Sequence, residues 1–424
     1  MKTKLKLILL SFLEFAVWGS YLTSMGSYLN SIDLGSFIGY FYSGQGFVSL
    51  FMPALIGIIA DKWISAEKVL GYCHILAAAF MLGAFWYCFS VEAGGGTPQF
   101  ALLYTLYMLS IAFYMPTIAL SNSVSYYALK SAGLDTVKDF PSIRIFGTIG
   151  FICSMVCVDF AGLQSTSWQF FVCGALGMLM GAYSFTLPKV PVTKSTKSTK
   201  LVDIFGLRAF ALFSQKKMAI FFIFSMLLGA ALQVTNGYAN VFIGSFAEIP
   251  AYADTFGAKH ANVLISLSQC SETLCILLIP FFMKRLGIKV VMVISMLAWV
   301  LRFGLFGIGD PGSGVWLFVL SMLVYGVAFD FFNISGSLFV EKEADESIKS
   351  SAQGLFMMMT NGFGATLGTL AAMAVINSYV YSQQTIEAKM AGWSTSWLIF
   401  AGYSLVIAIV FALVFKYKHN PKEA

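Results

Sequence analysis

Ionisable side chains inside long apolar segments are the first candidates for chemistry in this chain. The first to consider are Glu14, Arg144, Glu272, Arg302 and Asp330. A charge at the centre of a lipid bilayer costs about 2.5–3.5 kcal/mol on insertion scales, so each of them needs a partner, a cavity or a function. Desolvation favours the neutral form of a carboxyl, and a carboxyl that gains and loses a proton can carry it. Glu272 and Asp330 are therefore the candidates for proton coupling, with Asp330 preferred.

Polar and aromatic residues recur around these positions at helical spacing. Arg144, Thr148 and Phe151 stand at i, i+4 and i+7, which places them on one face of a helix. Three further segments show similar stripes: Gln233 with Asn236, Gln269 with Glu272, and Tyr325, Phe329 and Asn333 beside Asp330. Carboxylates and amides suit hydroxyls and base edges, and aromatic rings suit a flat base. The mixture fits a nucleoside, and it also fits a sugar.

The composition shows which elements must position these stripes. The chain has 424 residues, of which 58% are hydrophobic and only 11% are charged. A soluble domain is roughly 45–50% apolar and about 25% charged, so this chain is not an ordinary soluble protein. Its apolar runs match the roughly 20 helical residues that cross a bilayer. We expect an all-α membrane protein, with the bilayer as its solvent.

Apolar windows predict twelve transmembrane helices in two six-helix halves. Residues 1–187 form the N-terminal half, 188–217 a polar cytoplasmic linker, and 218–424 the C-terminal half. The predicted spans are approximately 5–29, 36–60, 67–90, 99–127, 142–161, 167–187, 218–243, 261–283, 290–308, 314–340, 351–375 and 393–415. The linker contains the low-complexity run 194–200, which cannot bury a core.

The distribution of basic residues predicts the orientation. If both termini are cytoplasmic, nearly all of the 26 Lys and Arg lie in the tails and cytoplasmic loops. The exceptions are Lys259 and Lys389 in outer loops, and Arg144 and Arg302 at or within spans. Because cytoplasmic loops are enriched in Lys and Arg, this favours cytoplasmic termini. The net charge of +6 is explained by topology, and nothing indicates nucleic-acid binding.

Several motifs resemble a known family of transporters. The segment Gly57-x-x-x-Asp61-Lys62 is similar to the loop motif of the major facilitator superfamily, although Ile64 replaces its usual glycine. The segments 139–151, 228–236, 268–273, 325–336 and 351–354 are similar to those of bacterial nucleoside:proton symporters, the nucleoside permeases of that superfamily. The resemblance extends from Leu10 to about His419.

This resemblance implies a function and a set of site residues. It implies a secondary active transporter in the bacterial inner membrane that imports nucleosides such as uridine or adenosine with protons, by alternating access. The substrate-binding residues that it implies are Arg144, Thr148, Phe151, Gln233, Asn236, Gln269, Glu272, Tyr325, Phe329 and Asp330. The alternative is the same fold carrying a sugar or oligosaccharide with protons.

Simpler structural roles remain open for several of these side chains. Phe151 and Phe329 could be packing residues, since the chain holds 41 phenylalanines. Arg302 matches no motif and is interpreted as structural. Glu14 either lines the cavity or pairs locally, and for His74 a packed or hydrogen-bonded role is favoured over proton relay.

Other functional classes find no support in the sequence. The chain has three histidines, far apart in sequence, and no nucleophile paired with a base, so an enzyme is not expected. Its seven cysteines lie in apolar spans without metal-ligand spacing, and no phosphate-binding loop is present. We expect no cofactor and no metal, and a monomer in the bilayer driven by a gradient.

Overall fold

The structure, a computed structural model, describes residues 2–192, 207–345 and 348–417, and it contains helices and no strand within those ranges. The chain divides into two compact units, Met1–Ser198 and Thr199–Ala424. Nine helices among the described residues are long and apolar enough to cross a membrane. The prediction of an all-α membrane protein is confirmed.

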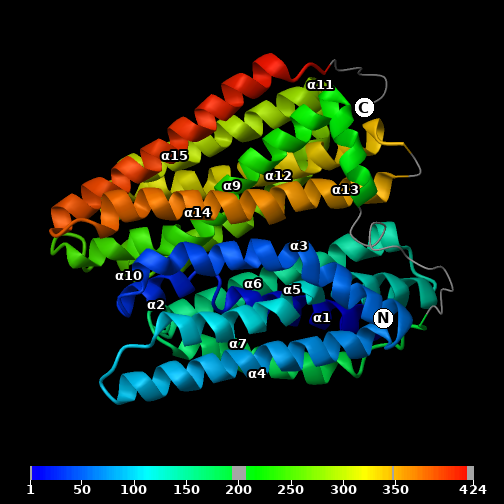
Figure 1. The fold of residues 1–424 in the computed structure, drawn as a ribbon, viewed down its shortest axis with the longest axis horizontal. Helices are drawn as coiled ribbons and strands as arrows, with labels where there is room; N and C mark the ends of the chain where they lie inside the picture. The colour runs from blue at the N-terminus through cyan, green and yellow to red at the C-terminus, as the bar shows by residue number, and fades with distance from the viewer. Residues whose placement is uncertain (1, 193–206, 346–347, 418–424) are drawn as a thin grey trace. The chain divides into compact units, whose positions relative to one another are not determined.

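The first unit is built from long helices joined by short loops. Its elements are α1 (Lys2–Gly19), α2 (Met25–Ser31), η1 (Gly35–Phe37), α3 (Ile38–Lys62), α4 (Ala66–Ala93), α5 (Phe100–Ser131), α6 (Thr136–Phe160) and α7 (Trp168–Ser184). Helix α4 lies along α7, and α1 packs on α6, α7 and α5 (Figure 1). The predicted first span is not one helix, because the backbone turns between α1 and α2.

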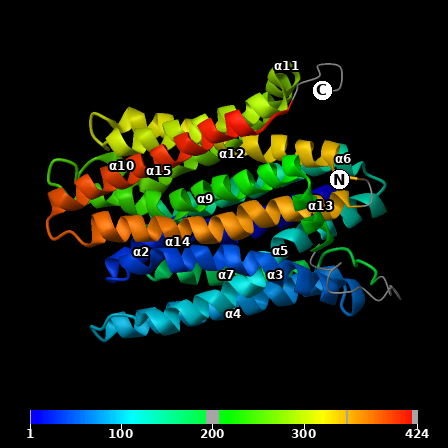
Figure 2. The ribbon, with the colours of Figure 1, turned by 45° about the horizontal axis from the view of Figure 1, so that its top comes forward.

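The second unit follows the same style of construction. Its elements are η2 (Leu207–Ser214), α9 (Lys216–Ser245), η3 (Phe246–Glu248), α10 (Phe256–Lys259), α11 (Ala261–Ile308), α12 (Val315–Glu343), α13 (Lys349–Met357), the π-helical η4 (Met358–Gly364), α14 (Ala365–Ile376), the π-helical η5 (Asn377–Tyr381) and α15 (Ile386–Val414). Helix α11 packs against α12 and α15 (Figure 2).

Helix α11 contains two of the predicted spans. Its 48 residues include a break at Gly287, where φ is 79° and ψ is 167°. A side chain rarely adopts this backbone conformation, so glycine makes the turn possible there. The break falls inside the predicted corner between the eighth and ninth spans.

The segment predicted as a polar linker contains packed structure. Its low-complexity run lies outside the described residues, but η2 follows and packs against α9 and α13. The side chains of Ala209 and Leu212 are buried there. The C-terminal part of residues 188–217 is therefore part of the second unit rather than a tether, because apolar residues interrupt its polar composition.

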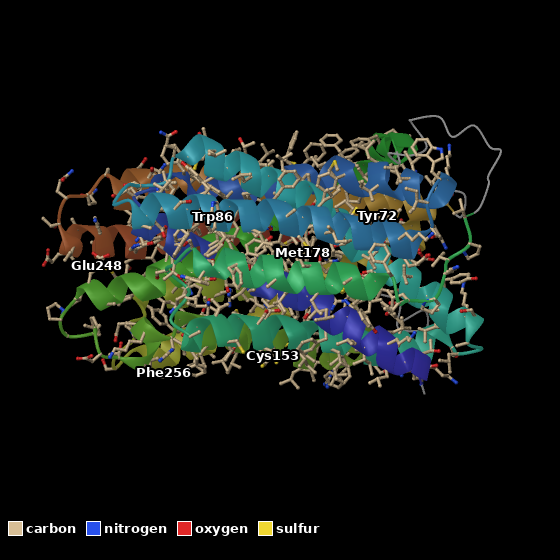
Figure 3. All side chains as sticks on the ribbon, turned by 90° about the horizontal axis from the view of Figure 1, so that it is seen from below. Tyr72, Trp86, Cys153, Met178, Glu248 and Phe256 are labelled. Carbon is tan, nitrogen blue, oxygen red and sulfur yellow. The ribbon has the colours of Figure 1, made fainter. Side chains whose placement is uncertain are left out.

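The outer surfaces of the helices are apolar. Tyr72 and Trp86 of α4 project outward, and the Trp86 side chain is 68% exposed (Figure 3). Many leucine, isoleucine and phenylalanine side chains are similarly exposed on the long helices. A soluble protein rarely exposes so much contiguous apolar surface, so these faces are the lipid-facing ones. The chain is a multi-pass membrane protein.

Candidate functional site

The first polar stripe consists of Arg144, Thr148 and Phe151 on α6, and close packing of α6 on α1 positions it. A Cβ atom added at Gly150 would overlap the backbone oxygen of Phe12, and one at Gly19 would overlap the backbone oxygen of Phe151. Small residues let two membrane helices approach closely, and the resulting backbone contact holds them in register. These glycines therefore set the position of α6 relative to α1, and with it the residues of the stripe.

The stripe on α6 faces aromatic residues of α1. The guanidinium carbon of Arg144 lies 3.9 Å from the centre of the Phe15 ring, within the range of a cation–π contact. The Phe151 ring meets the Trp18 ring at 6.2 Å with an interplanar angle of 88°. Thr148, one turn before Phe151, is half-buried. Arg144 is thus held against a ring at a partly buried position within the first unit.

Glu14 and His74 meet in the interior of the first unit. Their side chains are both 0% exposed, and Glu14 Oε2 lies 2.9 Å from His74 Nε2. The other carboxyl oxygen, Oε1, lies 2.6 Å from the Thr117 hydroxyl. Of the two roles left open for Glu14, the structure shows the local pairing, and His74 is hydrogen-bonded as favoured.

In the second unit, glycines at helix contacts position the stripe of Gln233 and Asn236 on α9. A Cβ atom at Gly229 of α9 would overlap the backbone oxygen of Thr360, and one at Gly368 of α14 would overlap Ala230. The π-helical turn η4 and α14 therefore lie directly against α9. This contact fixes the stretch of α9 that follows, where Gln233 and Asn236 are located.

The two amides on α9 are linked to each other. Asn236 Nδ2 donates a hydrogen bond to Gln233 Oε1 at 2.9 Å. Gln233 is buried, whereas Gln269 on α11 is half-buried. The internal bond satisfies one acceptor of Gln233 and leaves further hydrogen-bonding capacity on both amides. Such a pair can offer donors and acceptors to a ligand from a fixed position.

Two aromatic rings stack on α12 and form the Tyr325–Phe329 column. Tyr325 and Phe329 stack with ring centres 5.7 Å apart and an interplanar angle of 5°. The guanidinium carbon of Arg302 lies 4.6 Å from the Tyr325 ring centre, and Trp299 meets that ring edge-on. Arg302 is 2% exposed and donates to the Ser321 backbone oxygen at 2.8 Å. The interpretation of Arg302 as structural missed its contact with a candidate site residue.

Asp330 follows this column and is 5% exposed. Its Oδ2 atom is buried and has no hydrogen-bond partner among the described residues. Glu272 on α11 is half-buried and close enough to interact electrostatically with Asp330 and Tyr325. Two carboxyls thus share one region of the second unit, and one of them has an unpaired oxygen inside the protein.

A cavity within the second unit lies beside the aromatic column. It is lined by Leu228, Gly229, Leu232, Trp299, Ala328, Phe329, Phe332, Asn333, Thr360 and Asn361. Phe329 and Asn333 were singled out by their spacing on one helix. The sequence pattern did not indicate Thr360 and Asn361, because they lie in the π-helical turn η4, whose residues do not follow the spacing of an α-helix. Among the residues that the structure describes, no three His, Cys, Asp or Glu side chains gather as metal ligands would.

Helices long and apolar enough to span a bilayer, with polar and carboxyl side chains in their interior, are typical of a membrane transporter. The match to the family model described as nucleoside H+ symporter covers residues 1–420. The chain belongs to that family, whose members are transporters and not enzymes.

Individual proteins of known name are similar over nearly the whole chain. The nucleoside permease NupG of Escherichia coli (strain K12) is 49% identical over 423 residues, covering 99% of this chain and 97% of that protein. The xanthosine permease of the same organism is 46% identical over 426 residues, with 100% and 98% covered. A crystal structure of the nucleoside transporter NupG is similar with a TM-score of 0.89 and 48% identity, covering 99% of this chain and 100% of that one. The resemblance to nucleoside:proton symporters is confirmed.

Proposed function

We propose that this chain imports nucleosides together with protons across the bacterial inner membrane, by alternating access of a major facilitator fold. Membership of the nucleoside H+ symporter family supports proton-coupled nucleoside import. The mechanism rests on the carboxyl of Asp330. This carboxyl is buried beside the Tyr325–Phe329 column, and one of its oxygens has no hydrogen-bond partner among the described residues. A buried carboxylate with an unpaired oxygen is costly, so Asp330 is suited to take up a proton at one stage of the cycle and to release it at another.

The finer architecture is part of the proposal. We infer twelve transmembrane helices in two six-helix halves, 1–187 and 218–424, acting as a monomer in the bilayer. The nine apolar helices support this number. Helix α11 accounts for two spans. The first predicted span corresponds to α1 together with α2, and the sixth corresponds to the 17-residue helix α7.

We propose that the nucleoside is bound by residues from the stripes described above. These are Arg144, Thr148, Phe151, Gln233, Asn236, Gln269, Glu272, Tyr325, Phe329 and Asp330. Within the second unit, the linked amides and the stacked rings support roles in base and ribose recognition. In the first unit, the ring of Phe151 is proposed to stack on the base.

Competition for labelled uridine uptake tests the substrate class. In cells that lack their own nucleoside transporters, excess unlabelled uridine or adenosine should reduce uptake by this chain to background. An equal excess of glucose, xylose or lactose should leave uptake unchanged, because a sugar lacks the base that the aromatic and amide side chains recognise. No uridine uptake above background, together with uptake of a labelled sugar, would favour the sugar transporter instead.

We further propose that both termini are cytoplasmic. Cysteines introduced singly at Lys189 and Gly95, in a chain without the native seven, should react with a membrane-impermeant maleimide from opposite sides. Lys189 follows the last helix of the first unit, and Gly95 lies in the exposed loop between α4 and α5, at the far end of α4. The Gly95 variant is expected to react in intact cells, and the Lys189 variant only in inside-out vesicles. Reaction of both from the same side would contradict this topology.

A further inference from the structure

We propose that Glu14, held by His74 and Thr117, is a second proton-binding site, separate from Asp330, that exchanges a proton during transport. The proposal rests on the proposed proton symport and adds a site in the first unit. Glu14 and His74 are 60 residues apart in sequence and meet with no solvent exposure of either side chain. A carboxyl buried against a neutral or charged imidazole can hold one exchangeable proton.

The hydrogen bonds of Thr117 allow Glu14 to be either ionised or protonated. The Thr117 hydroxyl oxygen lies 2.6 Å from Glu14 Oε1 and 2.6 Å from the Tyr114 backbone oxygen. A hydroxyl has one hydrogen to donate, and a backbone carbonyl can only accept. When Glu14 is ionised, Thr117 donates to Oε1. When Glu14 is protonated, its own hydroxyl donates to Thr117, which then donates to Tyr114. Rotation of one hydroxyl therefore serves both states.

His74 is best placed as a neutral donor that positions Glu14. Its Nδ1 atom is buried and has no hydrogen-bond partner among the described residues. A charged imidazolium carries N–H groups on both nitrogens and would bury one of them unpaired. The neutral ring with its hydrogen on Nε2 donates to Glu14 Oε2 in both states of the carboxyl. The exchangeable proton is thus assigned to Glu14, and His74 is a positioning residue.

A small cavity in the first unit adjoins the imidazole. Its lining includes His74, Tyr21, Ser110 and Tyr114. The Tyr21 hydroxyl, like His74 Nδ1, is buried without a hydrogen-bond partner among the residues described. Buried water binds where several unpaired polar atoms face one space, and water can deliver protons. The cavity supplies a place for such exchange beside the pair.

Titratable groups surround the pair on several helices. They are Tyr21 after α1, Cys73 on α4, Tyr114 on α5 and Cys173 on α7, and Arg144 of α6 acts on the same Tyr114. Glu14 and Arg144 thus both interact electrostatically with Tyr114. Protonation of Glu14 changes the charge beside Tyr114, and through this shared neighbour proton binding is linked to the binding of a substrate at Arg144.

Replacing Glu14 by glutamine tests the proposal. The amide of Glu14→Gln can accept from His74 and donate to Thr117, so both contacts persist without a titratable proton. We expect uridine counterflow to persist in proteoliposomes, while the proton-to-uridine ratio from reversal potentials falls by one. Glu67→Gln is the matched control. Glu67, on α4, is a buried glutamate like Glu14, and it accepts hydrogen bonds from the Ser65 hydroxyl and the Val190 backbone N–H. Its ratio should equal that of the parent. An unchanged ratio in Glu14→Gln would overturn the proposal.

If Glu14→Gln does not transport uridine, infrared difference spectra test whether Glu14 takes up and releases a proton. Between acid and alkaline pH, the purified parent should show a carboxylic-acid C=O band that is missing from Glu14→Gln. In His74→Gln this band should persist at a shifted frequency, since the carboxyl keeps its proton and loses its imidazole partner. The same band in Glu14→Gln as in the parent would overturn the assignment. If the proposed proton symport is itself wrong, uridine flux by the parent will not respond to an imposed pH gradient. This result distinguishes failure of the proposed function from failure of the Glu14 assignment.

Discussion

Asp330→Asn is expected to lower uphill uridine accumulation about fiftyfold while leaving uridine exchange intact. Asparagine keeps the size and hydrogen-bonding oxygen of the side chain but cannot take up a proton. Because Asp330 is buried with an unpaired carboxyl oxygen, the neutral amide resembles its protonated state. The substituted chain should bind and exchange nucleoside, with one proton fewer coupled to each transport cycle. At a membrane potential of about 100 mV the internal-to-external ratio of labelled uridine should therefore fall by a factor of about fifty.

A carboxylate outside the proposed site provides the control. Asp310 accepts hydrogen bonds from the backbone N–H groups of Gly312 and Gly314 through Oδ1, an atom that asparagine retains. Asp310→Asn should accumulate uridine as the parent does. Accumulation by Asp330→Asn as high as that of the parent would move this proton to Glu272. Parent-level accumulation in variants at Asp330, Glu272 and Glu14 would end the carboxylate mechanism.

Phe151→Ala is expected to weaken uridine binding about 5- to 150-fold. Stacking of a base on an aromatic side chain contributes about 1–3 kcal/mol, and about 1.4 kcal/mol corresponds to a tenfold change in Kd. Isothermal titration of the purified protein with uridine measures the loss directly. Phe151→Tyr retains a stacking face and should bind within a few-fold of the parent.

A phenylalanine on the lipid-facing side of the same helix is the matched control. Phe160 is 63% exposed near the end of α6, so Phe160→Ala should leave the Kd unchanged. Phe151 also contacts Trp18, and for this reason the melting temperature of each variant must be compared with that of the parent. Binding by Phe151→Ala as tight as that of the parent would make this ring a packing residue only.

Residue patterns within one helix could be predicted from the sequence. The spacing of Tyr325 and Phe329 by four places their rings on one face, and the structure stacks them. The same holds for Gln233 and Asn236, which hydrogen-bond across one turn. Composition and apolar run lengths likewise predict the membrane class, because the bilayer imposes the same length and polarity on each span.

Contacts between helices could not be predicted in this way. Nothing in the sequence pairs Glu14 with His74, because their meeting depends on how α1 and α4 each pack on α5 and α7. Arg302 was recognisable as a charge in an apolar span, but its place under Tyr325 follows only from the packing of α11 on α12. The break between α1 and α2 and the π-helical turn η4 are local distortions that apolar periodicity does not record.

Uridine accumulation by the purified parent chain in proteoliposomes tests the central claim most directly. A potassium gradient with valinomycin imposes an inside-negative potential of about 100 mV, and one proton moving inward with each neutral nucleoside then releases about 2.3 kcal/mol. The account predicts that labelled uridine reaches at least about fifty times its external concentration, and that a protonophore returns the ratio to one. A ratio that stays at one under the imposed potential would contradict proton-coupled import.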